Sequence, residues 1–227
     1  MPLTVTDRYD QLYNEFRWKV PTRFNIAQVC CTRWAKGQRR VAIRLRDCAG
    51  VEHEITYQRL DADSNRLANA LRALGVKRGD RVAIVLPQRP ETAVAHLACY
   101  KLGAVAMPMS VLFGPQALAF RLHNSATRVV LVDAEYLDAM RTAVNEHGTQ
   151  LDHIIVTEAP GIEPLPGNKQ TGELKYKDLL ERARDTMRPV STLADDPALL
   201  VYTSGTTGPP KGALVPHRSM IGNLTGF

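Results

Sequence analysis

The segment of the chain best suited to chemistry is residues 202–212, which read YTSGTTGPPKG. It combines hydroxyl side chains, glycines and one lysine, and it directly follows an apolar run from Ala198 to Tyr202. Glycines let backbone N–H groups approach an anion closely, hydroxyls can donate to phosphate oxygens, and the ammonium of Lys211 would offset negative charge. The residue types therefore predict a loop that holds a polyphosphate.

This segment does not have the spacing of a Walker A nucleotide loop. Pro210 stands where that pattern places its second glycine, and Lys211 is followed by Gly212 instead of Ser or Thr. The alternative is a flexible polar connection between two strands, because Gly, Ser, Thr and Pro are common in loops. We favour a ligand loop, since the segment follows a predicted parallel strand, and ligands of open α/β sheets bind beyond the carboxyl ends of such strands.

Other reactive side chains are interpreted as structural. His217, in the sequence VPHRS, is expected at the start of the next helix, with a ligand role as the alternative, and Lys101 and His96 are expected to support the fold. Met107 and Met109 could line an acyl pocket, but methionine more often fills gaps in a core. The six histidines and four cysteines lack paired metal-ligand spacings, so no metal ligand is assigned and the cysteines are expected to be reduced.

Hydrophobic periodicity predicts alternating helices and strands. A helix from Tyr57 carries leucines on one face and polar residues, including Asp61, on the other, and Gly75 ends it. The unalternating run Val82 to Leu86 predicts a strand covered on both faces. The pattern continues with helix 90–102, strand 104–107, helix 116–123, strand 128–132, helix 134–146, strand 153–156, a surface loop over 157–173, helix 176–185 and strand 198–202. This order predicts an α/β fold with a parallel sheet flanked by helices.

The charge is concentrated at the amino-terminal end. The chain has 29 Lys and Arg against 23 Asp and Glu, and the whole excess of +6 falls in residues 1–50. A basic arm could bind nucleic acid, but Arg44 and Arg46 alternate with Ile43 and Leu45, as on the solvent face of a half-buried strand. No nucleic-acid motif accompanies them, so no nucleic-acid partner is predicted.

Composition and length limit the class of protein. With 44% apolar and 23% charged residues, the chain has the composition of a soluble globular protein. Its longest apolar runs are far shorter than the roughly 20 residues of a membrane span, and residues 1–16 lack the pattern of a secretory signal. We therefore predict a cytoplasmic protein without a transmembrane segment. Residues 1–50 are expected to form a basic arm and first strand packed on the domain that begins at residue 51.

Residues 202–212 resemble the phosphate-binding loop of the adenylate-forming (AMP-binding) superfamily, which includes acyl-CoA synthetases, peptide-synthetase adenylation domains and luciferases. Further segments resemble the family in the same order: ITYQRL at 55–60, GVKRGDRVAIVLPQRPE at 75–91, and KLGA with the following Pro108. The stretch FRWKVPTRFNIAQ at 16–28 is similar to acyl-CoA synthetases of the medium-chain and acetate-like branches. The resemblance covers nearly the whole chain.

The resemblance implies a ligase that acts in two steps. A carboxylic acid would displace pyrophosphate from ATP, with Mg²⁺, to give an acyl-adenylate, and coenzyme A would then accept the acyl group. By this resemblance the phosphate binders are Thr203, Ser204, Gly205, Thr206, Thr207, Gly208 and Lys211. Lys211 is also the candidate catalytic residue, because a loop cation can stabilise the charge that develops on the departing pyrophosphate.

The family's adenine-binding segment, ribose-binding acid, hinge and carboxyl-terminal lysine have no counterpart before Phe227. We therefore expect the chain to be an amino-terminal piece of a ligase that binds nucleotide weakly and forms no acyl-CoA alone. An isolated piece would also expose sheet edges, which favours self-association into homo-oligomers. Two alternatives stay open: an amino-acid adenylation domain of a peptide synthetase, and a noncatalytic nucleotide-binding or interaction module that uses the basic arm.

Overall fold

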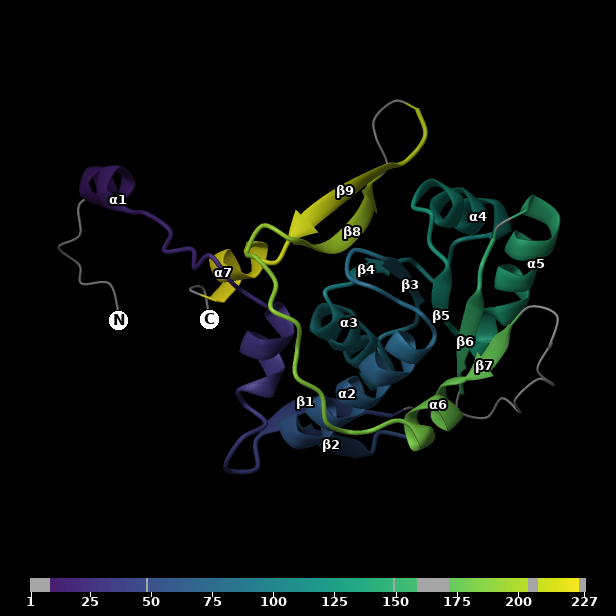
Figure 1. Cartoon of the computed structure of the whole chain (residues 1–227), viewed down its shortest axis with the longest axis horizontal. Coiled ribbons are helices and arrows are strands. Elements are labelled where there is room, and N and C mark those ends of the chain that lie inside the picture. The colour runs from purple at the N-terminus through teal and green to yellow at the C-terminus, as the bar shows by residue number, and fades with distance from the viewer. Residues whose placement is uncertain (1–8, 48, 149, 159–171, 204–207, 225–227) are drawn as a thin grey trace.

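The fold is built on one large sheet (Figure 1). The computed structural model describes residues 9–47, 49–148, 150–158, 172–203 and 208–224. Within them, seven strands pair in the order β7-β6-β5-β3-β4-β8-β9. Their bounds are β3 Arg81–Val85, β4 Val105–Pro108, β5 Val129–Asp133, β6 His153–Thr157, β7 Glu173–Lys175, β8 Pro197–Thr203 and β9 Lys211–Pro216. All neighbouring pairs are parallel except β8 and β9.

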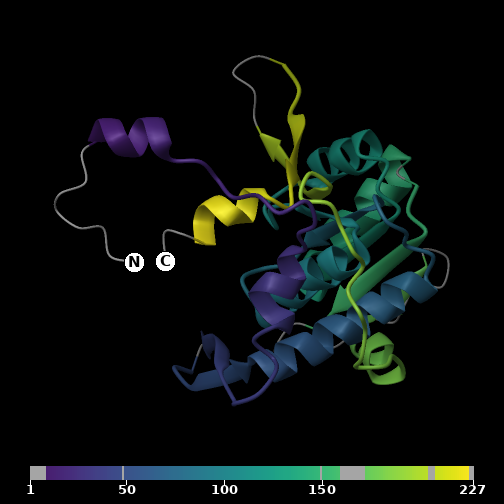
Figure 2. The same ribbon diagram turned by 60° about the vertical axis from the view of Figure 1, so that its left-hand side comes forward.

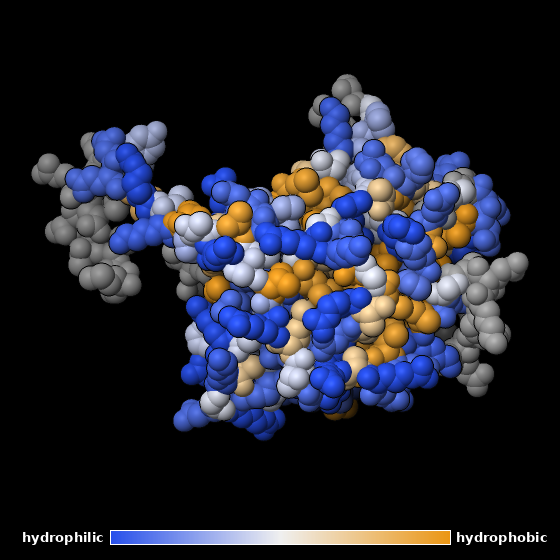
Figure 3. All heavy atoms as spheres, viewed as in Figure 1, coloured by the Kyte–Doolittle hydropathy of each residue, from blue (hydrophilic) through white to orange (hydrophobic). Residues whose placement is uncertain are grey.

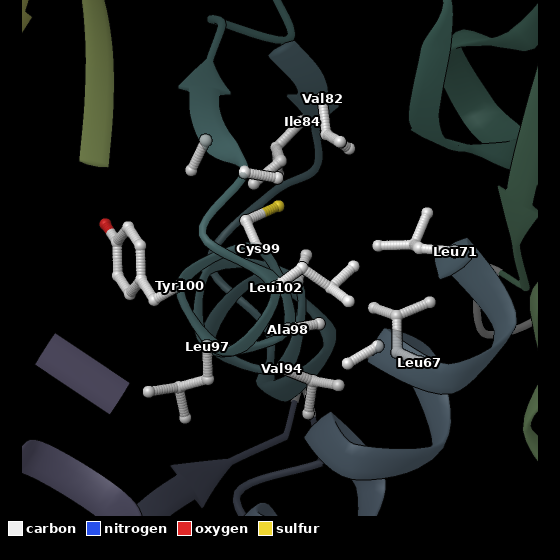
Figure 4. Packing of buried hydrophobic residues seen from close by; sticks show 14 of the residues in the cluster. Leu67, Leu71, Val82, Ile84, Val94, Leu97, Ala98, Cys99, Tyr100 and Leu102 are labelled. Carbon is white, nitrogen blue, oxygen red and sulfur yellow. The ribbon is translucent and has the colours of Figure 1, made fainter. Parts of the chain in front are cut away.

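Helices cover both faces of this sheet. One face packs against α2 (Tyr57–Ala73), α3 (Pro90–Leu102) and α6 (Tyr176–Arg182), and the other against α4 (Pro115–Asn124) and α5 (Leu137–His147). A short 3₁₀ turn, η2 (Ala134–Tyr136), leads into α5. Consecutive strand residues alternate between the two cores: Val82 and Ile84 face α2 and α3, whereas Ala83 and Val85 face α4 and α5. Figure 4 shows leucines of α2 meeting the apolar side chains of α3 beneath β3.

The amino-terminal elements lie outside the large sheet. They are α1 (Tyr9–Glu15), the short π-helix η1 (Gln28–Thr32), and a separate antiparallel pair, β1 (Val41–Arg46) and β2 (Glu52–Thr56). Figures 1 and 2 agree that α1 stands apart from the layered body, while the carboxyl-terminal α7 (Ser219–Leu224) lies between α1 and the body. No helix of the described residues is long and apolar enough to cross a bilayer.

The fold confirms the predicted α/β class, and α2 begins at Tyr57 and is followed by Gly75 in the left-handed region, φ +91°, as expected. The structure adds a strand that the predicted element order does not include, β9, which runs antiparallel to β8 because a short loop joins them without a crossover. Two local expectations differ. The predicted loop over 157–173 ends in a three-residue strand, β7, which is too short to show a period, and the part at 159–171 lies outside the described residues. Helix α6 ends at Arg182 instead of Asp185.

A fully buried lysine joins the two long helices of one layer. Lys101 of α3 has no solvent exposure, and its Nζ donates to the side chains of Asp61 (2.8 Å), Ser64 (2.7 Å) and Asn65 (2.6 Å) of α2. Nζ also lies 3.0 Å from the backbone oxygen of Asp61. Burial lowers the pKa of Lys101, and the Asp61 carboxylate opposes this shift. The expectation that Lys101 is structural agrees with this placement.

The position of Asp61 corrects the helix pattern drawn from the sequence. Asp61 was expected on the solvent face of α2, but its carboxylate faces α3 and its side chain is only 17% exposed. Thr32 of η1 also donates to its Oδ1, at 2.7 Å. The leucine spacing correctly predicted which face of α2 is apolar. It could not show that Lys101, on another helix, would contact Asp61 at the edge of that face.

We predict that Lys101→Met destabilises the chain by about 3 kcal/mol, because Asp61 would keep a partly buried charge without its partner. Equilibrium urea unfolding of the purified chain measures this change. Lys77→Met, at an exposed lysine, is the matched control and should change the unfolding free energy by less than about 0.5 kcal/mol.

In the same experiment, the double variant Lys101→Met with Asp61→Asn should recover part of the loss, because it removes both charges. A Lys101→Met chain as stable as the original would show that the network does not hold α2 and α3 together.

Candidate functional site

The described ends of the predicted phosphate loop lie at the outer end of the β8–β9 hairpin, which extends beyond the rest of the sheet (Figure 1). Thr203, the last residue of β8, pairs with Lys211, the first residue of β9, so these two residues form the base of the loop. Both are exposed, as is Gly208. Ser204, Gly205, Thr206 and Thr207 lie outside the described residues. The structure thus brings Thr203, Gly208 and Lys211 to one end of one hairpin.

Two glycines of this segment have different roles. Gly208 has φ +90°, a conformation that residues with a Cβ rarely adopt, so it permits the turn back toward β9. Gly212 lies within β9, where a Cβ would come 3.0 Å from Leu200 Cδ1 and 3.3 Å from the Tyr202 ring. The sequence grouped Gly212 with the loop, but in the structure it allows β9 to pack closely against β8.

The hairpin is fixed to α4 through Tyr202. The Tyr202 hydroxyl donates to Asn124 Oδ1 at 2.6 Å, and the guanidinium carbon of Arg121 lies 5.7 Å from the centre of its ring. Both partners belong to α4, and Tyr202 is the residue just before Thr203. The start of the loop is therefore held by a helix, although Thr203 itself is exposed.

The carboxyl ends of β5 and β6 carry a buried ion pair at the same edge of the sheet. The Asp133 side chain is 0% exposed and pairs with Arg89, which lies just before α3. Thr157 at the end of β6 donates to Asp133 Oδ2 at 3.2 Å, and the backbone N–H of Glu135 donates to its Oδ1 at 3.1 Å. The sequence analysis missed this pair. Arg89 and Asp133 lie far apart along the chain, and only the parallel sheet brings their strand ends together.

His217 is a buried structural residue at the end of the hairpin. It follows β9 directly and is 0% exposed, and its Nδ1 accepts a hydrogen bond from the Ile26 N–H at 3.3 Å. Its ring lies edge-on to Tyr100, with the ring centres 5.8 Å apart. Because Nδ1 accepts, the neutral ring carries its proton on Nε2. The helix-entry interpretation agrees with its place just before α7, and the structure adds that it joins the hairpin to the amino-terminal segment.

The methionines and cysteines considered in the sequence analysis pack within the fold. Met107 and Met109 are buried in the core beside α4 and α5. Cys30, Cys31 and Cys99 are free thiols, and burial raises the pKa of Cys31 and Cys99 to about 12. In the described part of the chain, no group of three or more His, Cys, Asp or Glu side chains could hold a metal ion.

Comparison with known families identifies this architecture. Residues 31–227 match the AMP-binding enzyme family. The chain belongs to this family. The matched range includes the entire sheet and the β8–β9 hairpin, and thus the segment 202–212 on which the resemblance was first based.

Curated acetyl-coenzyme A synthetases are similar over most of the chain. The acetyl-coenzyme A synthetase of Salmonella typhi is 37% identical over 215 residues, which cover 87% of this chain and 32% of the relative. That of Marinobacter nauticus is 33% identical over 218 residues, covering 91% of this chain and 33% of the relative. The chain therefore spans about a third of the length of the curated relatives it matches.

Two solved structures share the fold. A Brucella canis acyl-CoA synthetase superposes with a TM-score of 0.81 at 28% identity, covering 95% of this chain and 39% of that one. The anthranilate CoA ligase AuaEII, solved with anthranoyl-AMP, gives a TM-score of 0.75 at 26% identity over 88% of this chain and 36% of that one.

We predict that two buried histidines make the chain less stable in mild acid. Burial lowers the pKa of His96 and of His217 to about 4. Unfolded histidine takes up a proton near pH 6.5, so between pH 6.5 and about 4 the unfolded state binds more protons than the folded state. The unfolding free energy should therefore fall as the pH falls through this range, by up to about 1.4 kcal/mol per pH unit for each histidine.

Urea unfolding at several pH values measures this slope. His217→Gln should flatten this slope, because the substitution removes one of the two buried histidines. Equal slopes in the original chain and in His217→Gln would mean that His217 is already protonated when folded.

Proposed function

We propose that this chain provides the phosphate-binding part of an ATP-dependent acid–CoA ligase. Such an enzyme joins a carboxylic acid to AMP, releases pyrophosphate, and then transfers the acyl group to coenzyme A. The observation that carries the proposal is the pairing of Thr203 at the end of β8 with Lys211 at the start of β9, which forms the base of the loop. The printed names of the relatives, acetyl-coenzyme A synthetase and acyl-CoA synthetase, support the same reaction class.

The chemistry of adenylation fits this loop. Attack of a carboxylate on the α-phosphorus breaks the bond to the β-phosphate oxygen, and negative charge develops on the departing pyrophosphate. Backbone N–H groups, hydroxyls and an ammonium that are already in place stabilise that charge without reorganising during the reaction. In our proposal, Thr203, Ser204, Gly205, Thr206, Thr207 and Gly208 bind the phosphates, and Lys211 supplies the positive charge.

Lys211 suits this role because it is exposed and lies at the start of a strand. In the part of the chain that the structure describes, no carboxylate forms an ion pair with it, so its charge is available to a ligand. Mg²⁺ would accompany the triphosphate and neutralise part of its charge. We assign no Mg²⁺ ligand among the described residues, since they contain no cluster suited to a metal.

The acid is proposed to lie in the acetate-like to medium-chain range, by the resemblance of residues 16–28 to those branches and by the printed name of the acetyl-coenzyme A synthetases. The anthranoyl-AMP in AuaEII is the kind of acyl-adenylate that the proposed first step would form. Because this chain spans about a third of its relatives' length, the complete reaction is proposed for a longer protein that contains it.

Acid-dependent exchange of labelled pyrophosphate into ATP tests the proposal. In a longer protein that contains the chain, Lys211→Ala should slow this exchange about a hundredfold, the effect of removing roughly 3 kcal/mol of transition-state stabilisation. Acyl transfer from preformed acyl-adenylate to coenzyme A should change much less. Lys77→Ala, an exposed lysine distant from the hairpin in sequence, is the control.

The 227-residue chain assayed alone is expected to form no acyl-CoA. Unchanged exchange in Lys211→Ala would remove Lys211 from the site. No exchange with acetate, medium-chain or aromatic acids in the longer protein would contradict the proposed reaction.

A further inference from the structure

A cavity of about 700 Å³ opens beside the first turn of α4. Its wall is formed by Gly114, by Pro115, Gln116, Ala117, Phe120 and Arg121 of α4, by Thr142 and Glu146 of α5, and by Pro210 from the phosphate-loop segment. It thus lies between the two helices of one layer and the base of the β8–β9 hairpin. None of the side chains proposed to bind ATP lines it.

Arg121 is an unusual member of this wall because it is a buried cation without a counter-charge. It is 8% exposed, and in the described residues no carboxylate lies within ion-pair distance of its guanidinium. Its Nη1 donates to the backbone oxygen of Ala117 at 2.8 Å, whereas its Nε is buried without an acceptor. A buried charge is costly unless it is paired and hydrogen-bonded.

The packing of Arg121 directs it toward the start of its own helix. Helical side chains lean toward the amino-terminal end, and the bond to Ala117 places the guanidinium beside the first turn. Its carbon lies 4.0 Å from the centre of the Phe113 ring, which orients the planar group. Arg121 lines the cavity, so this contact orients its guanidinium at the cavity wall.

The first turn of α4 adds a second positive feature at the same place. Its first N–H groups have no partner inside the helix, and Gly114 at the N-cap position provides no side-chain hydrogen bond to them. Pro115 at the first helical position has no N–H, so the donors that remain are those of the residues after it. The aligned peptide dipoles make this end of the ten-residue helix attractive to anions.

We propose that this cavity binds a phosphate group, held by the Arg121 guanidinium and the first turn of α4. A planar guanidinium and a helix amino terminus are the donors that proteins commonly use for phosphate. The volume exceeds that of a free phosphate ion, so the cavity has room for a phosphate that belongs to a larger molecule. The site is separate from the loop proposed to bind ATP, and the proposal does not depend on the ligase reaction.

Glu146 is expected to weaken the affinity of the cavity for phosphate. Its carboxylate lies on the cavity wall and would repel an anion, although solvent screens it because Glu146 is exposed. Thr142 is a neutral neighbour on the same helix that lines the cavity without taking part in the Arg121 contacts. These two positions allow the charge of the cavity to be changed in both directions without altering Arg121.

Titration calorimetry tests the site, in the full chain carrying Lys211→Ala so that the phosphate loop contributes less. The probes are inorganic phosphate, pyrophosphate, ATP and coenzyme A. Arg121→Met should weaken binding of the phosphate probes at least about tenfold, and Thr142→Asp should weaken it by a similar factor. Glu146→Gln should strengthen binding about threefold. Glu52→Gln, the same charge change at an exposed position of β2, should have no effect.

The pattern across probes identifies the source of the phosphate. Charge-dependent changes for inorganic phosphate and pyrophosphate alone indicate a free anion, and the same changes for ATP or coenzyme A indicate a phosphate carried by that molecule. If Arg121→Met does not fold, the opposite effects of Thr142→Asp and Glu146→Gln on phosphate binding test the proposal instead. Binding that these three substitutions leave unchanged, or the absence of binding for all four probes, would overturn the proposal.

Discussion

The arrangement of the chain depends on the buried ammonium of Lys101. By accepting its three hydrogens, Asp61, Ser64 and Asn65 fix α2 against α3, and α3 continues through Gly103 into β4. Gly103 has φ +67°, so the chain can turn there directly from helix to strand. β4 pairs with β8, the strand that carries the phosphate loop. The buried charge of Lys101 therefore contributes, through α3 and β4, to the position of β8 and of the loop that follows it.

The sheet concentrates polar groups at one edge. Because its crossover strands are parallel, the carboxyl ends of β5, β6 and β8 lie on the same side, together with the Asp133 ion pair and the base of the phosphate loop. The surface beside the hairpin also exposes apolar groups (Figure 3), including Leu214 of β9, which is 61% exposed. Such a surface suits contact with further protein, in line with the expected self-association, which stays a prediction.

Patterns confined to one segment could be predicted, and contacts between distant segments could not. The helix α2 and the strand β3 follow from their own leucine spacing and apolar run, and the loop 202–212 is recognisable from its residue types alone. The antiparallel course of β9, the inward face of Asp61 and the Arg89–Asp133 pair were missed, because each depends on which elements become neighbours. Arg121 reads as an ordinary helix residue until its burial beside Phe113 is known.

The bond between Ile26 and His217 spans 191 positions. A ribosome exposes the stretch around Ile26 long before it makes the hairpin that completes this contact, so early stages of synthesis leave that stretch without its final partner. Long-range closure of this kind slows folding and prolongs the exposure of apolar surface. During translation, a chaperone could therefore reach this stretch until the hairpin has been made.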